Sequence, residues 1–80
     1  MRVTVRLFAR YREAADTAAI DLEVPSGATL AQIWESVRER IPALRGEARP
    51  LLACDQEYAA PERIVTGGEE IAAFPPVSGG

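Results

Sequence analysis

The sequence predicts one small domain of the α+β class, in which one main helix packs on one face of a sheet of about five strands. Three observations lead to this class. Apolar and polar residues alternate in residues 2–9 and 18–24, as in strands with one buried face. An apolar stripe with helical spacing follows in residues 29–41. Three short strand-like segments, separated by turn signals, complete the 80 residues.

The first two strands are predicted to be antiparallel neighbours. In residues 2–9 the odd positions up to Leu7 are apolar and the even ones polar, except that Phe8 lies on the polar side. Residues 10–17 are polar and alanine-rich, which suits one helical turn or a loop. Residues 18–24 alternate again and end at the turn signal of residues 25–27.

The main helix is predicted to start after Thr29. Gln32 follows three residues later, the spacing of a capping box, in which each side chain satisfies a free backbone N–H group. Pro42 cannot continue the helix. The apolar residues between them fall on one stripe that must be buried, and they are Leu30, Ile33, Trp34, Val37 and Ile41.

Three further strands are predicted in the second half of the chain. Residues 51–54 and 58–60 form a hairpin through residues 55–57. Residues 66–69 form a glycine-containing turn, and the last strand covers residues 70–74.

Composition excludes several classes of function. The net charge is -3 and all nine basic residues are arginine. An acidic chain disfavours nucleic-acid binding, which needs clustered cations, and favours a partner with a basic surface. No apolar run is long enough to span a bilayer. The single Cys54 and the lack of a secretory h-region in the first ten residues predict a cytoplasmic protein.

The side chains do not predict an enzyme. The chain contains no histidine, which excludes histidine bases, histidine nucleophile pairs and histidine metal ligands, and no metal site is expected. Cys54 lies in an apolar strand and is expected to be a buried hydrophobe. Gly67 and Gly68 are expected to form a turn rather than a phosphate loop. Glu69 and Glu70 are neighbours that point apart, which favours a solvated rim over a catalytic pair.

The end of the chain carries the functional prediction. We expect a domain in residues 1–74 and an extended tail in residues 75–80. Pro75 and Pro76 lack N–H groups, so pairing with a neighbouring strand weakens there. Gly79 and Gly80 have no side chains, so a narrow channel would admit them. A C-terminal carboxylate, with a pKa of about 3.3–3.7, is a poor electrophile at neutral pH. It would need activation by a separate enzyme.

The motif FPPVSGG in residues 74–80, together with the first strand VTVRLFARYRE, resembles the small subunit of molybdopterin synthase. The resemblance covers the whole chain in length and element order. It implies a β-grasp, ubiquitin-like fold with a mixed sheet. It also implies that Gly80 is adenylated by an activating enzyme, converted to a thiocarboxylate with sulfur from a donor, and inserted into the large subunit. Sulfur would then pass to a cyclic pyranopterin precursor in molybdenum cofactor biosynthesis.

The resemblance also assigns roles and partners. Gly79 would keep the tail slim, and residues 75–78, which are Pro75, Pro76, Val77 and Ser78, would line the channel of the large subunit. Two small and two large subunits would form a heterotetramer. No cofactor would be bound permanently, since ATP is used by the activating enzyme.

A β-grasp fold places the first and last strands side by side, so Phe8 and Phe74 would form an exposed apolar patch for the large subunit. The alternative is that either ring packs under a loop of its own domain. Arg10 and Arg12 would form a polar rim or a solvated surface.

Three alternative functions stay open. A carrier for thiamine synthesis or amino-acid thiolation would use the same tail with other docking residues. A ubiquitin-like modifier would form isopeptides on target lysines. A plain interaction domain would tolerate residues added after Gly80.

Overall fold

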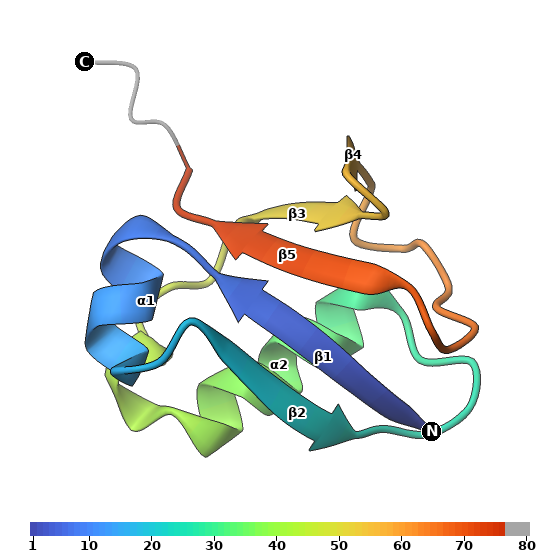
Figure 1. The fold of residues 1–80 in the computed structure, drawn as a ribbon, viewed down its shortest axis with the longest axis horizontal. Helices are drawn as coiled ribbons and strands as arrows, with labels where there is room; N and C mark the ends of the chain where they lie inside the picture. The colour runs from blue at the N-terminus through green and yellow to red at the C-terminus, as the bar shows by residue number, and fades with distance from the viewer. Residues whose placement is uncertain (77–80) are drawn as a thin grey trace.

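Five strands form one mixed sheet in the order β2-β1-β5-β3-β4 (Figure 1). The computed structural model describes residues 1–76. The strands are β1 (Arg2–Leu7), β2 (Ala19–Glu23), β3 (Leu51–Cys54), β4 (Glu57–Tyr58) and β5 (Glu70–Phe74). β5 is parallel to β1 and antiparallel to β3, while β2 and β4 pair antiparallel at the two edges. This is the β-grasp arrangement, and the predicted pairing of the first two strands is confirmed.

Helix α2 (Leu30–Arg40) covers one face of the sheet (Figure 1). Its predicted capping box is present, because Gln32 N donates to Thr29 Oγ1 at 3.2 Å and Thr29 N donates to Gln32 Oε1 at 2.8 Å. Both donors would otherwise be unsatisfied at the start of the helix. The helix ends before Pro42, which begins a short 3₁₀ helix, η1 (Pro42–Leu44).

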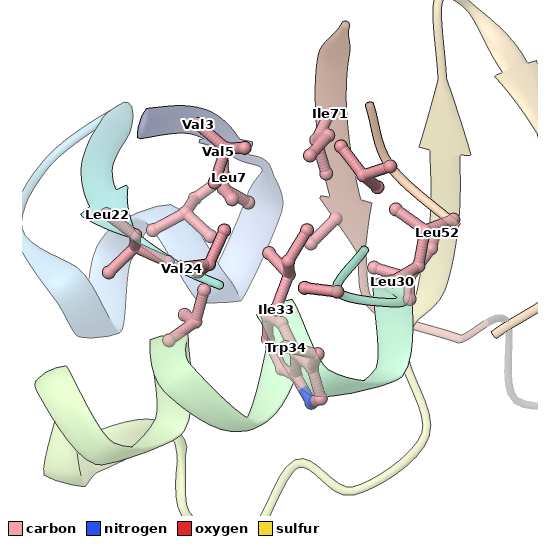
Figure 2. Close-up of a cluster of buried hydrophobic side chains, with 14 of the residues drawn as sticks. Val3, Val5, Leu7, Leu22, Val24, Leu30, Ile33, Trp34, Leu52 and Ile71 are labelled. Carbon is pink, nitrogen blue, oxygen red and sulfur yellow. The ribbon is translucent and has the colours of Figure 1, made fainter. Parts of the chain in front are cut away.

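The core lies between α2 and the sheet. Figure 2 shows strand side chains pointing toward those of the helix. The predicted helical stripe is buried from Leu30 to Val37, and Ile41 packs partly buried beside it. Burying each large apolar side chain contributes about 1.5–3 kcal/mol before the entropy cost. The labelled members are Val3, Val5, Leu7, Leu22, Val24, Leu30, Ile33, Trp34, Leu52 and Ile71.

A second helix, α1 (Ala9–Ala15), follows β1 directly. The sequence suggested one helical turn or a loop in residues 10–17 and placed Ala9 in the first strand. The strand instead ends at Leu7, and the helix includes Ala9. The reason is a tertiary contact: the Tyr11 side chain is fully buried, and its ring packs 5.1 Å from that of Trp34.

The hairpin between β3 and β4 turns on two residues rather than three. Cys54 pairs with Glu57, so only Asp55 and Gln56 lie in the turn. Both have positive φ, 52° and 70°, as a two-residue turn between twisted strands requires. The strand therefore starts at Glu57 and not at the predicted Tyr58.

Candidate functional site

The open face of the sheet, opposite α2, holds the candidate site at the end where β5 stops. β5 ends at Phe74, and Pro75 and Pro76 follow outside any strand. Figure 1 shows that β1 and β5 point toward this same end. Four of the predicted site residues, Val77, Ser78, Gly79 and Gly80, lie outside the described residues.

Three aromatic rings gather on this face, and we call them the aromatic surface: Phe8, Tyr58 and Phe74. The rings of Phe8 and Phe74 stack with centroids 4.5 Å apart and an interplanar angle of 13°. The Tyr58 ring meets Phe74 edge-on at 6.2 Å. Phe8 and Phe74 are half-buried, and Tyr58 is 74% exposed. The predicted proximity of Phe8 and Phe74 is therefore confirmed.

The backbone at the end of β1 directs Phe8 onto the open face. Phe8 is extended, with φ -128° and ψ 156°, so it continues the alternation of β1. Ala9 then has φ 52°, a left-handed conformation that costs a residue with a Cβ about 1–2 kcal/mol. The turn at Ala9 starts α1, and Tyr11 N donates to Phe8 O at 3.1 Å. The left-handed turn at Ala9 therefore keeps the Phe8 ring on the open face of the sheet.

An ion pair between Arg10 and Glu47 holds α1 in place, and a hydrogen bond from Trp34 positions Glu47. Arg10 donates through Nε and Nη2 to the two carboxylate oxygens of Glu47, at 3.1 and 2.8 Å. Trp34 Nε1 donates to the backbone oxygen of Glu47 at 2.7 Å. Arg10 is therefore paired within its own domain, and both Arg10 and Arg12 are exposed. Their place in a polar rim or a solvated surface stays a prediction.

The protonation states of Glu47 and Tyr11 follow from their surroundings. The hydrogen bonds from Arg10 hold the pKa of the Glu47 carboxyl below its ordinary value of 4.5. Burial raises the pKa of Tyr11 above its ordinary value of 10.0. At neutral pH Glu47 is therefore ionised and Tyr11 neutral, so the cluster is a fixed structural element rather than an acid–base pair.

A hollow of about 340 Å³ lies beside the aromatic surface. Its floor is made by Ala53 and Ala72, which are paired on adjacent strands. Their small side chains leave the space that larger residues would fill. Aromatic rings border it on one side, and polar groups on the other. The lining residues are Phe8, Ala53, Gln56, Tyr58, Glu70, Ala72 and Phe74.

The remaining chemical candidates are structural. Cys54 is buried, and burial raises the pKa of its thiol above 9.0, so the reactive thiolate is disfavoured. Gly67 and Gly68 have positive φ in a turn. Glu69 Oε2 accepts from Thr66 N at 2.8 Å, and this bond lowers the pKa of Glu69. The predictions that Cys54 is buried and that Gly67 and Gly68 form a turn are confirmed.

Two kinds of feature are absent from residues 1–76. Within this part of the chain, no cluster of three or more His, Cys, Asp or Glu side chains could hold a metal ion. No helix there is both long enough and apolar enough to cross a bilayer.

Sequence reasoning missed Tyr58 as a member of the site. It lies in a two-residue strand, too short for an alternating pattern. No sequence pattern marks Tyr58. The structure shows it opposite Ala53, and residues directly opposite in a sheet share a face. The Tyr58 ring therefore lies beside the small Ala53 side chain on the face of the sheet that no helix covers.

Similarity to known proteins extends over the whole chain. The model of the ThiS family matches residues 5–80. A molybdopterin synthase sulfur carrier subunit of Arabidopsis thaliana is 35% identical over 82 residues, which cover 100% of this chain and 84% of that protein. SAMP1 of Haloferax volcanii has a TM-score of 0.86 and 29% identity, covering 100% of both chains.

Two further structures share the fold. A putative molybdopterin converting factor subunit 1 of Pyrococcus furiosus has a TM-score of 0.86 and 26% identity, covering 96% of this chain and 99% of that one. A chain in the complex of subunits 1 and 2 of the molybdopterin-converting factor of Helicobacter pylori has a TM-score of 0.66 at 18% identity, over 100% of both chains. The second likeness concerns the fold alone.

Proposed function

Because this chain belongs to the ThiS family, we propose that it is the sulfur-carrier small subunit of a molybdopterin synthase. One observation carries the proposal: the family match runs to residue 80 and includes Gly79 and Gly80. The similarity to curated sulfur carrier subunits favours this pathway over thiamine synthesis or amino-acid thiolation.

The proposed chemistry takes place at the carboxylate of Gly80. An activating enzyme joins this carboxylate to the adenylyl group of ATP and releases pyrophosphate. A sulfur donor then displaces AMP, so that sulfur replaces one carboxylate oxygen and a thiocarboxylate forms. This chain supplies the carboxyl carbon, and the separate enzymes supply the catalytic groups. We also propose that the protein acts in the cytoplasm.

The fold supports such a role through the position of β5. A central strand, paired on both sides, holds Phe74 firmly, and the prolines after it carry the chain off the sheet. We propose that the tail enters the large subunit with Gly79 and Gly80 foremost, and that Pro75, Pro76, Val77 and Ser78 line the channel. The aromatic surface then docks on the large subunit, in an assembly of two small and two large subunits.

Intact mass spectrometry tests the proposal. The chain is incubated with its activating enzyme, ATP and a sulfur donor. We expect a mass gain of one oxygen-to-sulfur exchange, confined to the C-terminal peptide. A variant lacking Gly80 should fold equally well, as judged by thermal unfolding, and gain nothing. A variant with residues added after Gly80 is a second control, because its glycine carboxyl is blocked. If the variant that lacks Gly80 still transfers sulfur, the mechanism is refuted.

A protein modifier is the second candidate function. The similarity to SAMP1, named as small archaeal modifier protein 1, favours it. A modifier would form an isopeptide between Gly80 and lysines of other proteins. Since none of residues 1–80 is a lysine, any such ε-linked isopeptide identifies a different target chain. Tryptic digestion of cell extract separates the two functions. Arg63 is the last trypsin site of this chain, so a modifier would leave residues 64–80 attached to target lysines. The absence of such branched peptides, together with a thiocarboxylate, supports the carrier.

A further inference from the structure

The hollow beside Phe74 has two chemically different sides. Phe8, Tyr58 and Phe74 form an aromatic side, and Glu70 and Gln56 form a polar side. The floor of Ala53 and Ala72 is apolar. A group that fills this space must therefore have an apolar or planar body and a polar tip that suits a carboxylate.

Glu70 is held in position but its carboxylate is available. Its backbone N donates to Asp55 Oδ1 at 2.9 Å, and its backbone O accepts from Asp55 N at 2.8 Å. The residue is exposed. Within residues 1–76 the ion pairs are Arg2 with Glu23, Arg10 with Glu47, and Arg38 with Glu35, so none of these cations neutralises Glu70.

Arg2 and Arg6 of β1 are basic residues beside Glu70 on this face, and with Glu70 they line a separate hollow. Arg6 stands opposite Ala72, whereas Thr4 stands opposite Glu70. The residues that line the hollow beside Phe74 include no cation, so a positive group inside it would come from a docking partner.

We infer that the hollow receives an arginine side chain of the protein that docks on the aromatic surface. This inference rests on the proposed function. An aliphatic side chain there would bury the Glu70 carboxylate without a partner, which is costly. An acidic side chain would be repelled. A guanidinium group is planar, stacks on aromatic rings and forms two parallel hydrogen bonds to a carboxylate, which a lysine ammonium does not.

The size of the hollow agrees with one side chain rather than a cofactor. Pockets for small ligands run from about 300 to 1,000 Å³, and this one, at about 340 Å³, lies at the lower end and opens to solvent. Arginine is also enriched in protein interfaces, where lysine is depleted. The acidic net charge of -3 favours a basic partner surface in the same way.

Binding to the purified large subunit of molybdopterin synthase from the same organism tests the inference, with calorimetry at several salt concentrations. We expect Glu70→Gln to weaken binding about tenfold or more and to reduce its salt dependence. Ala72→Leu, which fills the floor, should weaken binding similarly while the fold is kept. Glu39→Gln is the matched control, because it removes the same charge from an exposed site on α2, on the other face.

Phe74→Ala separates failure of the inference from failure of the proposed docking. If Phe74→Ala weakens binding while Glu70→Gln behaves like Glu39→Gln, the inferred arginine contact is refuted and docking on the aromatic surface is supported. If Phe74→Ala leaves binding unchanged, the docking surface itself is wrong. A crystal structure of the complex then gives the decisive result: an arginine side chain in the hollow is expected, and any other occupant overturns the inference.

Discussion

Phe8 and Phe74 stack on each other because each directly follows the last paired residue of two parallel neighbouring strands. Leu7 stands opposite Ala73 at the ends of β1 and β5, and both aromatic residues continue in extended conformation on the open face. Their ring centroids lie 4.5 Å apart. The contact therefore depends on the parallel register of the two strands, and it places an aromatic pair beside the point where the tail leaves the sheet.

Removing either ring should affect binding more than folding. We expect Phe74→Ala and Phe8→Ala to lower the free energy of unfolding by only about 0.5–1.5 kcal/mol, the size of an aromatic pair contribution, since both rings are half-buried. Affinity for the large subunit should fall at least tenfold for Phe74→Ala. Urea unfolding and calorimetric titration measure the two effects. An exposed apolar residue outside the surface, Ile64, provides the control Ile64→Ala, which should leave affinity unchanged.

The left-handed backbone of Ala9 should limit which residues are accepted there. Ala9→Gly is expected to change the free energy of unfolding by less than about 1 kcal/mol, because relief of strain is offset by a more flexible unfolded chain. Ala9→Val should destabilise the protein by about 1–3 kcal/mol, because a β-branched residue fits φ 52° poorly. Nuclear Overhauser effects between the rings of Phe8 and Phe74 should persist in Ala9→Gly and weaken in Ala9→Val. Equal stability and equal ring contacts in both variants would contradict the role given to Ala9.

Stability in acid should depend on Glu47. Its pKa in the folded protein is lowered by the hydrogen bonds from Arg10, relative to an ordinary value of 4.5. A lowered folded-state pKa gives stability that is present above the unfolded-state pKa and is lost as the pH falls through the folded-state value. Glu47→Gln should therefore be less stable than the original protein at pH 7, and the difference should shrink below about pH 4.5.

Urea unfolding from pH 7 to pH 3 measures this difference. Glu13→Gln, which removes an exposed acid of α1, is the matched control. Two parallel stability curves for the original protein and Glu47→Gln across this range would show that the ion pair with Arg10 contributes nothing.

Cys54 should play no part in sulfur transfer. It is buried, and its thiol pKa is raised by burial, so alkylation by iodoacetamide should be slow in the native protein and fast in urea. Cys54→Ala should still acquire the C-terminal sulfur, as intact mass spectrometry would show. The loss of one buried sulfur should lower the free energy of unfolding by about 1 kcal/mol. Loss of sulfur acquisition by a folded Cys54→Ala protein would move the sulfur site from Gly80 to this thiol.

Local patterns predicted most of the sheet and the main helix. The alternation in β1, the capping box at Thr29 and the stripe of α2 are all set by residues close together in the sequence, so each is visible without a structure. The nearness of Phe8 and Phe74 followed from the β-grasp resemblance rather than from the residues themselves.

The contacts that position α1 could not be predicted in this way. The stretch after Phe8 is polar and alanine-rich, and its helix depends on Tyr11 packing against Trp34 and on Arg10 binding Glu47. Arg10 and Glu47 are 37 positions apart in the sequence, and no local pattern joins them. The hairpin was predicted with a turn of three residues, 55–57, whereas the turn has two, Asp55 and Gln56. Its length was missed because the sequence lacks the glycine that usually follows Asp or Asn in a two-residue turn.

The central place of β5 has a consequence for how the protein is made. Until Phe74 has left the ribosome, β1 and β3 have no strand between them and each presents open backbone hydrogen-bonding groups. The sheet therefore cannot close during translation of the earlier strands, and its folding must wait until β5 has emerged. During that interval the unpaired edges of β1 and β3 can pair with other chains, which is a route to aggregation.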